Sequence, residues 1–202
     1  MSAHLWVSAA VEGDVDEAVL TKLAESCGIS IRSVFGRMGK GAVCKRLDAY
    51  NRAAAHAPWI VLLDLDDDAS CAPERVSRLL PCRHRNLCFR IAVRAIESWL
   101  LADRNGFASY FGLRPAEVPQ STDLLSDPKS KVVDLARRSR KSEIRRELVP
   151  RPGSKKPVGP AYSSRMMEFA LYHWDPDVAA ASSESLRKCR LAMETMAQRL
   201  ST

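Results

Sequence analysis

The stretch Trp59-Ile60-Val61-Leu62-Leu63-Asp64-Leu65-Asp66-Asp67-Asp68 joins five consecutive apolar residues to a cluster of carboxylates. An apolar run without polar alternation is typical of a strand that is buried on both faces of a parallel sheet. Four aspartates within five residues mark the point where this strand ends. The stretch therefore predicts a central strand with a polar site at its carboxyl end.

Comparable units lie on both sides of this strand. Apolar runs predict further strands over residues 4–11, 29–36 and 87–93, and residues at helical spacing follow each strand. Val43, Leu47, Tyr50 and Ala54, for example, mark one face of a helix. The order β-α-β-α-β-α-β predicts an α/β fold with a parallel sheet and helices on both of its faces.

No strand pattern follows Asp103, and the remaining chain is helical in character. We therefore expect an α/β domain over residues 1–103 and a basic helical C-terminal extension over residues 104–202 that packs on it. The last helix spaces its apolar residues alternately by three and four: Leu186, Cys189, Met193, Met196 and Leu200. This spacing suits a seam with a second copy or a protein partner, but packing onto the same chain is the commoner outcome.

The composition places the protein among ordinary globular proteins. Its 202 residues are 46% apolar and 27% charged, with a net charge of +7. No window approaches the roughly 20 apolar residues that span a bilayer, and Glu12 and Asp14 interrupt any signal peptide. We expect a soluble, cytoplasmic chain that does not contact membranes, whose six scattered cysteines form no disulfides.

Acidic residues end two of the predicted strands. Glu12 ends the first, and Asp64 and Asp66 end the third on the same side of the chain. Carboxylates about 6 Å apart repel by about 3 kcal/mol per pair at an effective dielectric of about 20, so a cation is needed to hold them together. Ligands that are all oxygen favour Mg²⁺ or Mn²⁺. The alternative is an Asp-rich turn that caps the next helix.

Glu12-Gly13-x-x-Asp16 and Asp64-x-Asp66 resemble the two signature motifs of the toprim fold. That fold occurs in type IA and type II topoisomerases, bacterial primases, small ribonucleases and overcoming-lysogenization-defect nucleases. The resemblance covers residues 4 to about 93. Residues 97–103 are also similar to bacterial toprim-like proteins classed only as a domain of unknown function. The accessory domains of topoisomerases and primases are missing from this sequence.

The resemblance implies a role for each matching residue. Glu12 would act as general acid/base or as a metal ligand, and Asp64 and Asp66 would bind Mg²⁺. Asp16 would hold a second metal ion in nuclease-like members, and Asp68 would be a supporting carboxylate.

Two further residues are candidates for the same site. Gly36-Arg37-Met38-Gly39-Lys40-Gly41 lies between a strand and a helix, where backbone amides and Lys40 can meet a phosphate, although a plain turn is the alternative. Glu97 and Asp103 are six residues apart, about 600° around one continuous helix, so at most one of them joins the site. Glu97 is the better candidate, and its alternative is a surface pair with Arg94.

Basic residues concentrate between residues 129 and 165, which we call the basic segment. It holds twelve Lys and Arg against three Asp and Glu, whereas the rest of the chain holds 19 against 21. Such a segment favours a polyanion, above all nucleic acid, and the alternative is a solvated helix face. The candidate contacts are Arg137, Arg138, Arg140, Lys141, Arg145, Arg146, Arg151, Lys155 and Lys156.

Together these features predict a Mg²⁺-dependent, toprim-like nuclease acting on DNA or RNA, and the resemblance implies bacterial defence or DNA processing. A haloacid-dehalogenase-like phosphatase normally carries its Asp-x-Asp after the first strand of its domain, whereas two β-α units precede Asp64 here. A receiver domain leaves Glu12-Gly13 and the basic segment unexplained. The remaining alternative is a non-catalytic module that binds nucleic acid or a partner through a vestigial acidic pocket.

Overall fold

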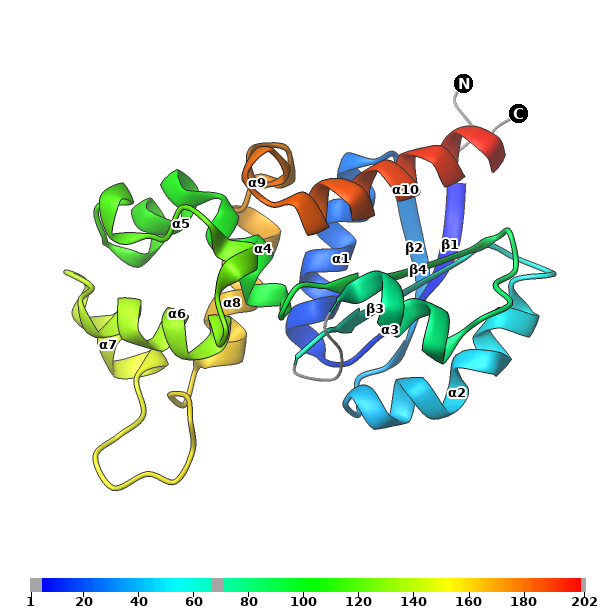
Figure 1. Cartoon of the computed structure of the whole chain (residues 1–202). Coiled ribbons are helices and arrows are strands. Elements are labelled where there is room, and N and C mark those ends of the chain that lie inside the picture. The colour runs from blue at the N-terminus through cyan, green and yellow to red at the C-terminus, as the bar shows by residue number, and fades with distance from the viewer. Residues whose placement is uncertain (1–4, 67–70, 201–202) are drawn as a thin grey trace.

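A parallel sheet of four strands forms one half of the molecule. The computed structural model describes residues 5–66 and 71–200. In it, β1 (Leu5–Val11), β2 (Ile29–Gly36), β3 (Trp59–Asp64) and β4 (Leu87–Ala92) lie in the order β2-β1-β3-β4 (Figure 1). The predicted parallel α/β fold is confirmed, and the strand predicted over residues 29–36 has those bounds.

The strand order places a switch point between the central strands β1 and β3, whose carboxyl ends separate. From β1 the chain crosses to β2 on one side, and from β3 it crosses to β4 on the other. β1 and β3 pair only from Ser8↔Trp59 to Ala10↔Val61, so their carboxyl ends are not held together by the ladder. In open α/β sheets ligands bind at this kind of switch point, outside the carboxyl ends of the strands.

Helices cover both faces of the sheet, as predicted. α1 (Asp14–Ser26) and α10 (Glu184–Leu200) pack on the face that includes Ile60 and Leu62. α2 (Lys40–Ala53) and α3 (Ala72–Leu79) pack on the face that includes Val61 and Leu63. The two faces alternate along β3 because successive side chains of a strand point in opposite directions.

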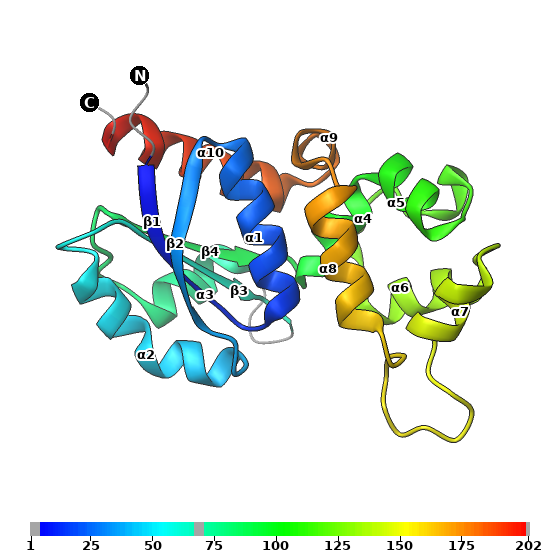
Figure 2. The same cartoon turned by 180° about the vertical axis from the view of Figure 1, so that it is seen from behind.

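The other half of the molecule is a helical lobe. It consists of α4 (Ile96–Ala102), α5 (Arg104–Phe111), α6 (Pro128–Arg137), α7 (Ser142–Leu148), α8 (Tyr162–Tyr172) and α9 (Pro176–Ser182), with 3-10 turns at Pro115–Glu117 and Thr122–Leu124. α8 lies beside α1, which joins the lobe to the sheet half (Figure 2). The predicted helical character of the C-terminal half is confirmed.

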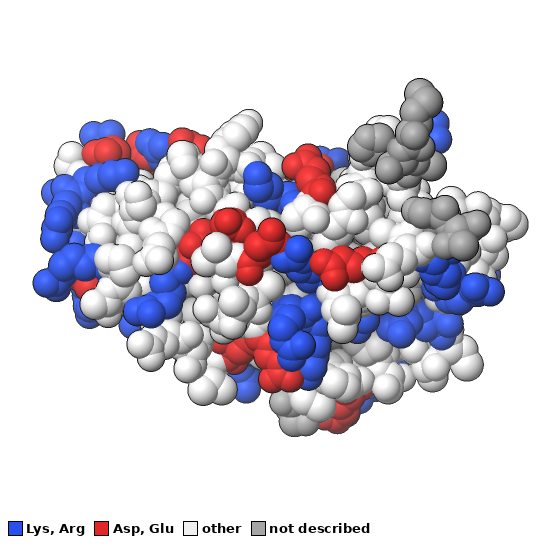
Figure 3. Space-filling model, turned by 90° about the horizontal axis from the view of Figure 1, so that it is seen from above, with Lys and Arg blue, Asp and Glu red and all other residues white. Residues whose placement is uncertain are grey.

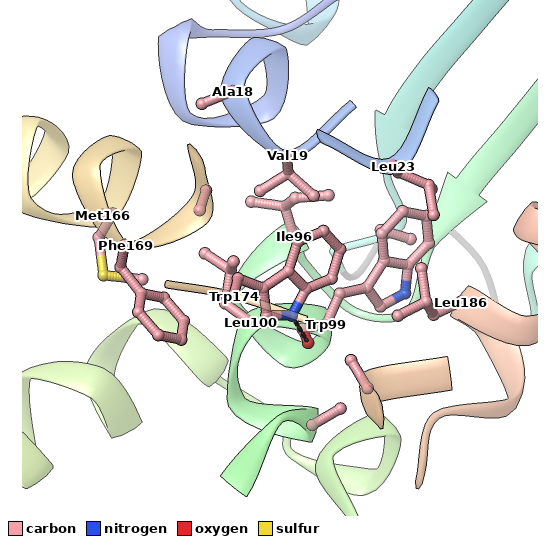
Figure 4. Packing of buried hydrophobic residues seen from close by; sticks show 14 of the residues in the cluster. Ala18, Val19, Leu23, Ile96, Trp99, Leu100, Met166, Phe169, Trp174 and Leu186 are labelled. Carbon is pink, nitrogen blue, oxygen red and sulfur yellow. Dashed lines mark hydrogen bonds between the residues drawn. The ribbon is translucent and has the colours of Figure 1, made fainter. Parts of the chain in front are cut away.

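Two tryptophans anchor the lobe to the sheet half. Trp99 and Trp174 are fully buried among residues of α1, α8 and α10 (Figure 4). Trp174 Nε1 donates to the carbonyl oxygen of Trp99 at 3.2 Å, and Trp99 Nε1 donates to Ser185 Oγ at 2.7 Å. Burial of an aromatic side chain of this size contributes roughly 4–6 kcal/mol of transfer free energy. One continuous core therefore runs through both halves.

Helix α10 uses its apolar spacing within its own chain. Leu186, Cys189, Met193 and Met196 are buried, and the helix packs beside β4. Of the two outcomes expected for this spacing, packing onto the same chain is the one observed.

Gly36 ends β2 at a point where another residue would not fit. Its φ is +91°, and a Cβ atom there would lie 2.3 Å from the carbonyl oxygen of Val11. The loop after Gly36 therefore runs against the end of β1, where Arg37 N and Gly39 N donate to the carbonyl oxygens of Val11 and Glu12, each at 2.9 Å. This contact brings the start of α2 to the carboxyl edge of the sheet.

All six cysteines are free thiols. Within residues 5–66 and 71–200, no helix combines the length and the apolar content needed to cross a bilayer.

Candidate functional site

Residues that follow all four strands meet at the carboxyl edge of the sheet. Five of them are carboxylates, which we call the acidic group: Glu12 after β1, Asp16 in the first turn of α1, Asp64 at the end of β3, Asp66 beyond it, and Glu97 in the first turn of α4 after β4. Lys40, the first residue of α2, follows β2 and pairs with Asp66. The structure thus brings together those predicted catalytic and metal-binding residues that lie within its described ranges.

Glu12 bridges the gap between β1 and β3. Its Oε1 accepts the backbone N–H of Asp64 at 2.7 Å, beyond the last paired residues of the two strands. A carboxylate takes this role well because hydrogen bonds to a charged acceptor are stronger than those between neutral groups. Glu12 therefore holds the two strand ends at a fixed separation across the switch point.

Asp66 lies at the exposed side of the group. Its backbone has a φ of +48°, in the left-handed region that Asp tolerates better than most residues. Its carboxylate pairs with Lys40 Nζ, and its side chain is 57% exposed. Solvent can therefore reach the acidic group past Asp66.

Each of the other three carboxylates has one buried oxygen atom that accepts no hydrogen bond from any described residue. Asp16 and Glu97 are 8% and 2% exposed. Asp16 Oδ1, Asp64 Oδ1 and Glu97 Oε2 are buried and have no hydrogen-bond partner among the described residues. A buried acceptor without a partner costs about 1–3 kcal/mol, and more when it is charged, so three such atoms in one place need an explanation.

Burial and repulsion by neighbouring carboxylates raise the pKa values of Asp16 and Asp64. Burial raises the pKa of Asp16 to about 7, and the negative charges of Glu12 and Glu97 add to the shift. The pKa of Asp64 is also well above its usual range, first through burial and then through the charges of Asp16, Glu97 and Glu12. These carboxylates affect one another's ionisation and form one electrostatic unit.

Two residues of the helical lobe complete the site, and the sequence analysis missed both in this role. Lys129 Nζ, on α6, lies 3.6 Å from Glu97 Oε1, and Tyr162 OH, on α8, donates to the same oxygen at 3.0 Å. The charge of Glu97 raises the pKa of Lys129. Burial raises the pKa of Tyr162 well above its usual range, so its hydroxyl stays a donor. Lys129 opens the basic segment, but only the fold shows that it reaches an acid.

Glu97 lies in the acidic group rather than in the surface pair with Arg94. Asp103 has a different role: its Oδ1 accepts Gly106 N at 3.0 Å and caps α5, and its Oδ2 accepts Asp175 N at 3.1 Å. α4 ends at Ala102 and α5 begins at Arg104, so the two carboxylates are on separate helices. The expectation that at most one of them joins the site agrees with this arrangement.

The donor atoms of the acidic group suit a hard divalent cation. They are all oxygens, and three of them are buried without a hydrogen-bond partner among the described residues. Mg²⁺ or Mn²⁺ would coordinate such oxygens and offset their negative charge. In the described parts of the chain, however, no three His, Cys, Asp or Glu side chains already meet as a ready-made metal cluster. Asp68 lies outside the described residues.

The basic segment presents its charge to solvent. All nine predicted contacts are exposed, and Figure 3 shows Lys and Arg along the outer end of the helical lobe. Some of this charge is used locally: Arg137 pairs with Asp134, Arg146 lies 3.7 Å from Glu147, and Lys141 Nζ donates to the carbonyl oxygen of Tyr110 at 2.7 Å. Arg151, Lys155 and Lys156 lie in the exposed loop between α7 and α8.

No protein-family model, curated protein or solved structure matches this chain.

Proposed function

We propose that this protein is a Mg²⁺- or Mn²⁺-dependent phosphodiesterase of the toprim-like type, a nuclease acting on DNA or RNA. The observation that carries the proposal is a set of three buried carboxylate oxygens, on Asp16, Asp64 and Glu97, that have no hydrogen-bond partner in the part of the chain that the structure describes. They lie beside Glu12 at the switch point of the sheet. A structural cap or turn does not require so many buried acids together. A site for a divalent cation does.

Asp16, Asp64, Asp66 and Glu97 would hold the cation, with Glu12 as a further candidate ligand. When bound there, the cation would polarise a phosphoryl oxygen, lower the pKa of a bound water and stabilise the leaving oxygen. Asp66 is the exposed member of the set, so it faces the side from which a substrate arrives.

Residues of the chain itself would take the other roles in binding and catalysis. Glu12 is placed to take a proton from an attacking water, and its bond to Asp64 N fixes its carboxylate. Lys40 lies beside Asp66 and can contact a phosphate oxygen with its ammonium group. Lys129 and Tyr162 orient Glu97. The basic segment would bind the nucleic-acid backbone through phosphates.

A second candidate is a non-catalytic module that binds nucleic acid or a partner. Two observations favour it: lysines already pair with Asp66 and Glu97, and no ready-made cluster of three metal ligands is present among residues 5–66 and 71–200. In this case Lys40 and Lys129 would serve as permanent counter-ions of the acidic group.

The two candidates are separated by incubating the purified chain with supercoiled plasmid, single-stranded DNA and RNA in Mg²⁺, Mn²⁺ or EDTA. A nuclease should cleave at least one of the three substrates with Mg²⁺ or Mn²⁺ and none in EDTA. The matched variants are Asp64→Asn in the acidic group and Asp48→Asn on the exposed side of α2. Loss of cleavage in Asp64→Asn but not in Asp48→Asn supports the proposal. No cleavage of any substrate by the wild-type chain favours the binding module.

A further inference from the structure

A second charged site lies under α10, toward the amino end of β4, whereas the acidic group lies at the carboxyl ends of the strands. A cavity of about 520 Å³ opens between β4 and α10, which run side by side (Figure 1). Its lining among residues 5–66 and 71–200 includes five cationic residues and no carboxylate: Arg83, Arg85, Arg90, Lys188 and Arg199. Leu87, Leu191 and Met196 form an apolar part of the wall.

The positive charge in this cavity is largely uncompensated. Within the described part of the chain, Arg199 donates to neutral acceptors only: Asn86 Oδ1 at 2.9 Å and the carbonyl oxygen of Arg85 at 2.8 Å. Arg83 Nη1 is 3.4 Å from the carbonyl oxygen of Phe89. Among the described residues, Lys188 alone of the five has an ion pair, with Glu184. Like charges brought together in this way repel one another unless an anion lies between them.

Arg90 is the least expected member of the set. It lies near the middle of β4, and its Nε is buried without a hydrogen-bond partner in the described structure. It is also next to Cys88: burial raises the pKa of that thiol, and the charge of Arg90 opposes the shift. A guanidinium held in a sheet face with an unsatisfied N–H costs free energy, which a bound anion would recover.

We propose that the cavity between β4 and α10 is an anion site that binds phosphate groups. Guanidinium groups match phosphate oxygens with paired, charge-assisted hydrogen bonds. The volume suits a ligand of nucleotide size. The site is distinct from the acidic group because Arg83 and Arg85 precede β4, whereas the carboxylates follow the opposite ends of the strands.

Two sources could supply the phosphates: a free nucleoside polyphosphate or a nucleic-acid strand. A neighbouring cavity of about 660 Å³ shares Arg83, Arg90 and Lys188, and extends to Leu65 and Arg94 near the acidic edge. A strand could follow both cavities, whereas a nucleotide fills the first. The test therefore uses three probes: inorganic tripolyphosphate, ATP and a short single-stranded oligonucleotide.

Binding is measured by calorimetry, and by fluorescence anisotropy for a labelled oligonucleotide, in EDTA at about 50 mM salt. The variants are Arg83→Gln, and Arg83→Gln combined with Arg90→Met. The matched control, Arg46→Gln with Arg187→Gln, removes two exposed charges outside the cavity. Thermal unfolding of each protein without ligand checks that it is folded. If Arg90→Met prevents folding, the single variant Arg83→Gln still tests the cavity.

The proposal expects at least one probe to bind, with affinity about tenfold or more lower in the double variant and lower to a smaller degree in Arg83→Gln. The control should change affinity less than about twofold. Loss confined to tripolyphosphate and ATP identifies a free polyphosphate, and loss for the oligonucleotide identifies a strand. Absence of binding by every probe, or equal losses in variant and control, overturns the proposal. Because no readout uses cleavage, the result is independent of whether the chain is a nuclease.

Discussion

The acidic group and the basic segment are both clusters of like charge, but the fold treats them in opposite ways. The acidic group gathers residues 12, 16, 64, 66 and 97 from distant parts of the chain, and all of them except Asp66 are buried or partly buried. The basic segment is continuous in sequence, yet its nine candidate contacts spread over exposed surface and partly pair with nearby acids.

This difference shows how much a cluster of charges in a sequence reveals about function. Exposed charges cost little to hold, so their arrangement is weakly constrained and each contributes little. Buried like charges are expensive, so a fold that keeps them has a compensating reason. The acidic group therefore carries more information about function than the basic segment, although the basic segment holds more charges.

The largest effect expected is on cleavage by Glu12→Gln. The amide oxygen of Gln can still accept Asp64 N–H, so the fold and most nucleic-acid affinity should remain. Loss of a general base should lower the cleavage rate about 10²-fold or more. Cleavage is followed by gel at saturating and limiting Mn²⁺. Partial rescue by high Mn²⁺ would make Glu12 a metal ligand instead, and the wild-type rate in limiting metal would remove it from the mechanism.

The next effect concerns the basic segment. Four phosphate contacts give a slope of about −3.6 in a plot of log affinity against log salt, so raising salt from about 50 to about 200 mM should weaken nucleic-acid binding about 10²-fold. Changing Arg137, Arg138, Arg145 and Arg146 to Glu should remove most of this dependence. Anisotropy titrations with a labelled oligonucleotide in EDTA measure both effects. An affinity that responds to neither change would leave the segment as a solvated surface.

Asp64→Asn should weaken Mn²⁺ binding about 10–100-fold, the loss seen even for outer partners of metal sites. The same change removes a repelling charge beside Asp16 and Glu97, so the chain in EDTA should unfold at a higher temperature than the wild type. Calorimetric titration and thermal unfolding give the two values. Unchanged Mn²⁺ affinity, with Asp48→Asn as the reference, would contradict the assignment of Asp64 as a ligand.

The last effect expected is a pH dependence of stability without metal. The pKa of Asp16 rises from 3.8 to about 7 on folding, so the folded state binds a proton that the unfolded state has released. The stability this provides is complete below about pH 3.8 and is lost as pH rises through about 7. Asp16→Asn should flatten this decline in chemical unfolding experiments in EDTA. An equal slope in the two proteins would show that other groups cause the decline.

The sequence predicted much of the sheet because its strands are continuous apolar runs with clear ends. The apolar run at Trp59 became a central strand buried on both faces, and Val43, Leu47 and Tyr50 became the buried face of α2. Asp64 and Glu12 could be placed together because parallel strands end at the same edge.

Other parts could not be predicted, because they depend on how the helical lobe folds back. Lys129 and Tyr162 reach Glu97 across 32 and 65 positions of sequence, and no local pattern encodes such a contact. The role of α10 was open for a related reason: its apolar spacing suits any partner surface, and only the completed sheet shows that its own β4 is that surface.

The position of α10 also has a consequence for synthesis of the chain. Ala92 and Glu184 are 92 positions apart, yet α10 covers the face of the sheet beside β4. At about 5–20 residues per second, a ribosome needs roughly 5–20 s to reach the start of this helix after finishing β4. During that interval the nascent sheet has an uncovered apolar face around Cys88 and Ala92. A chaperone that holds the growing chain would be most useful in this window.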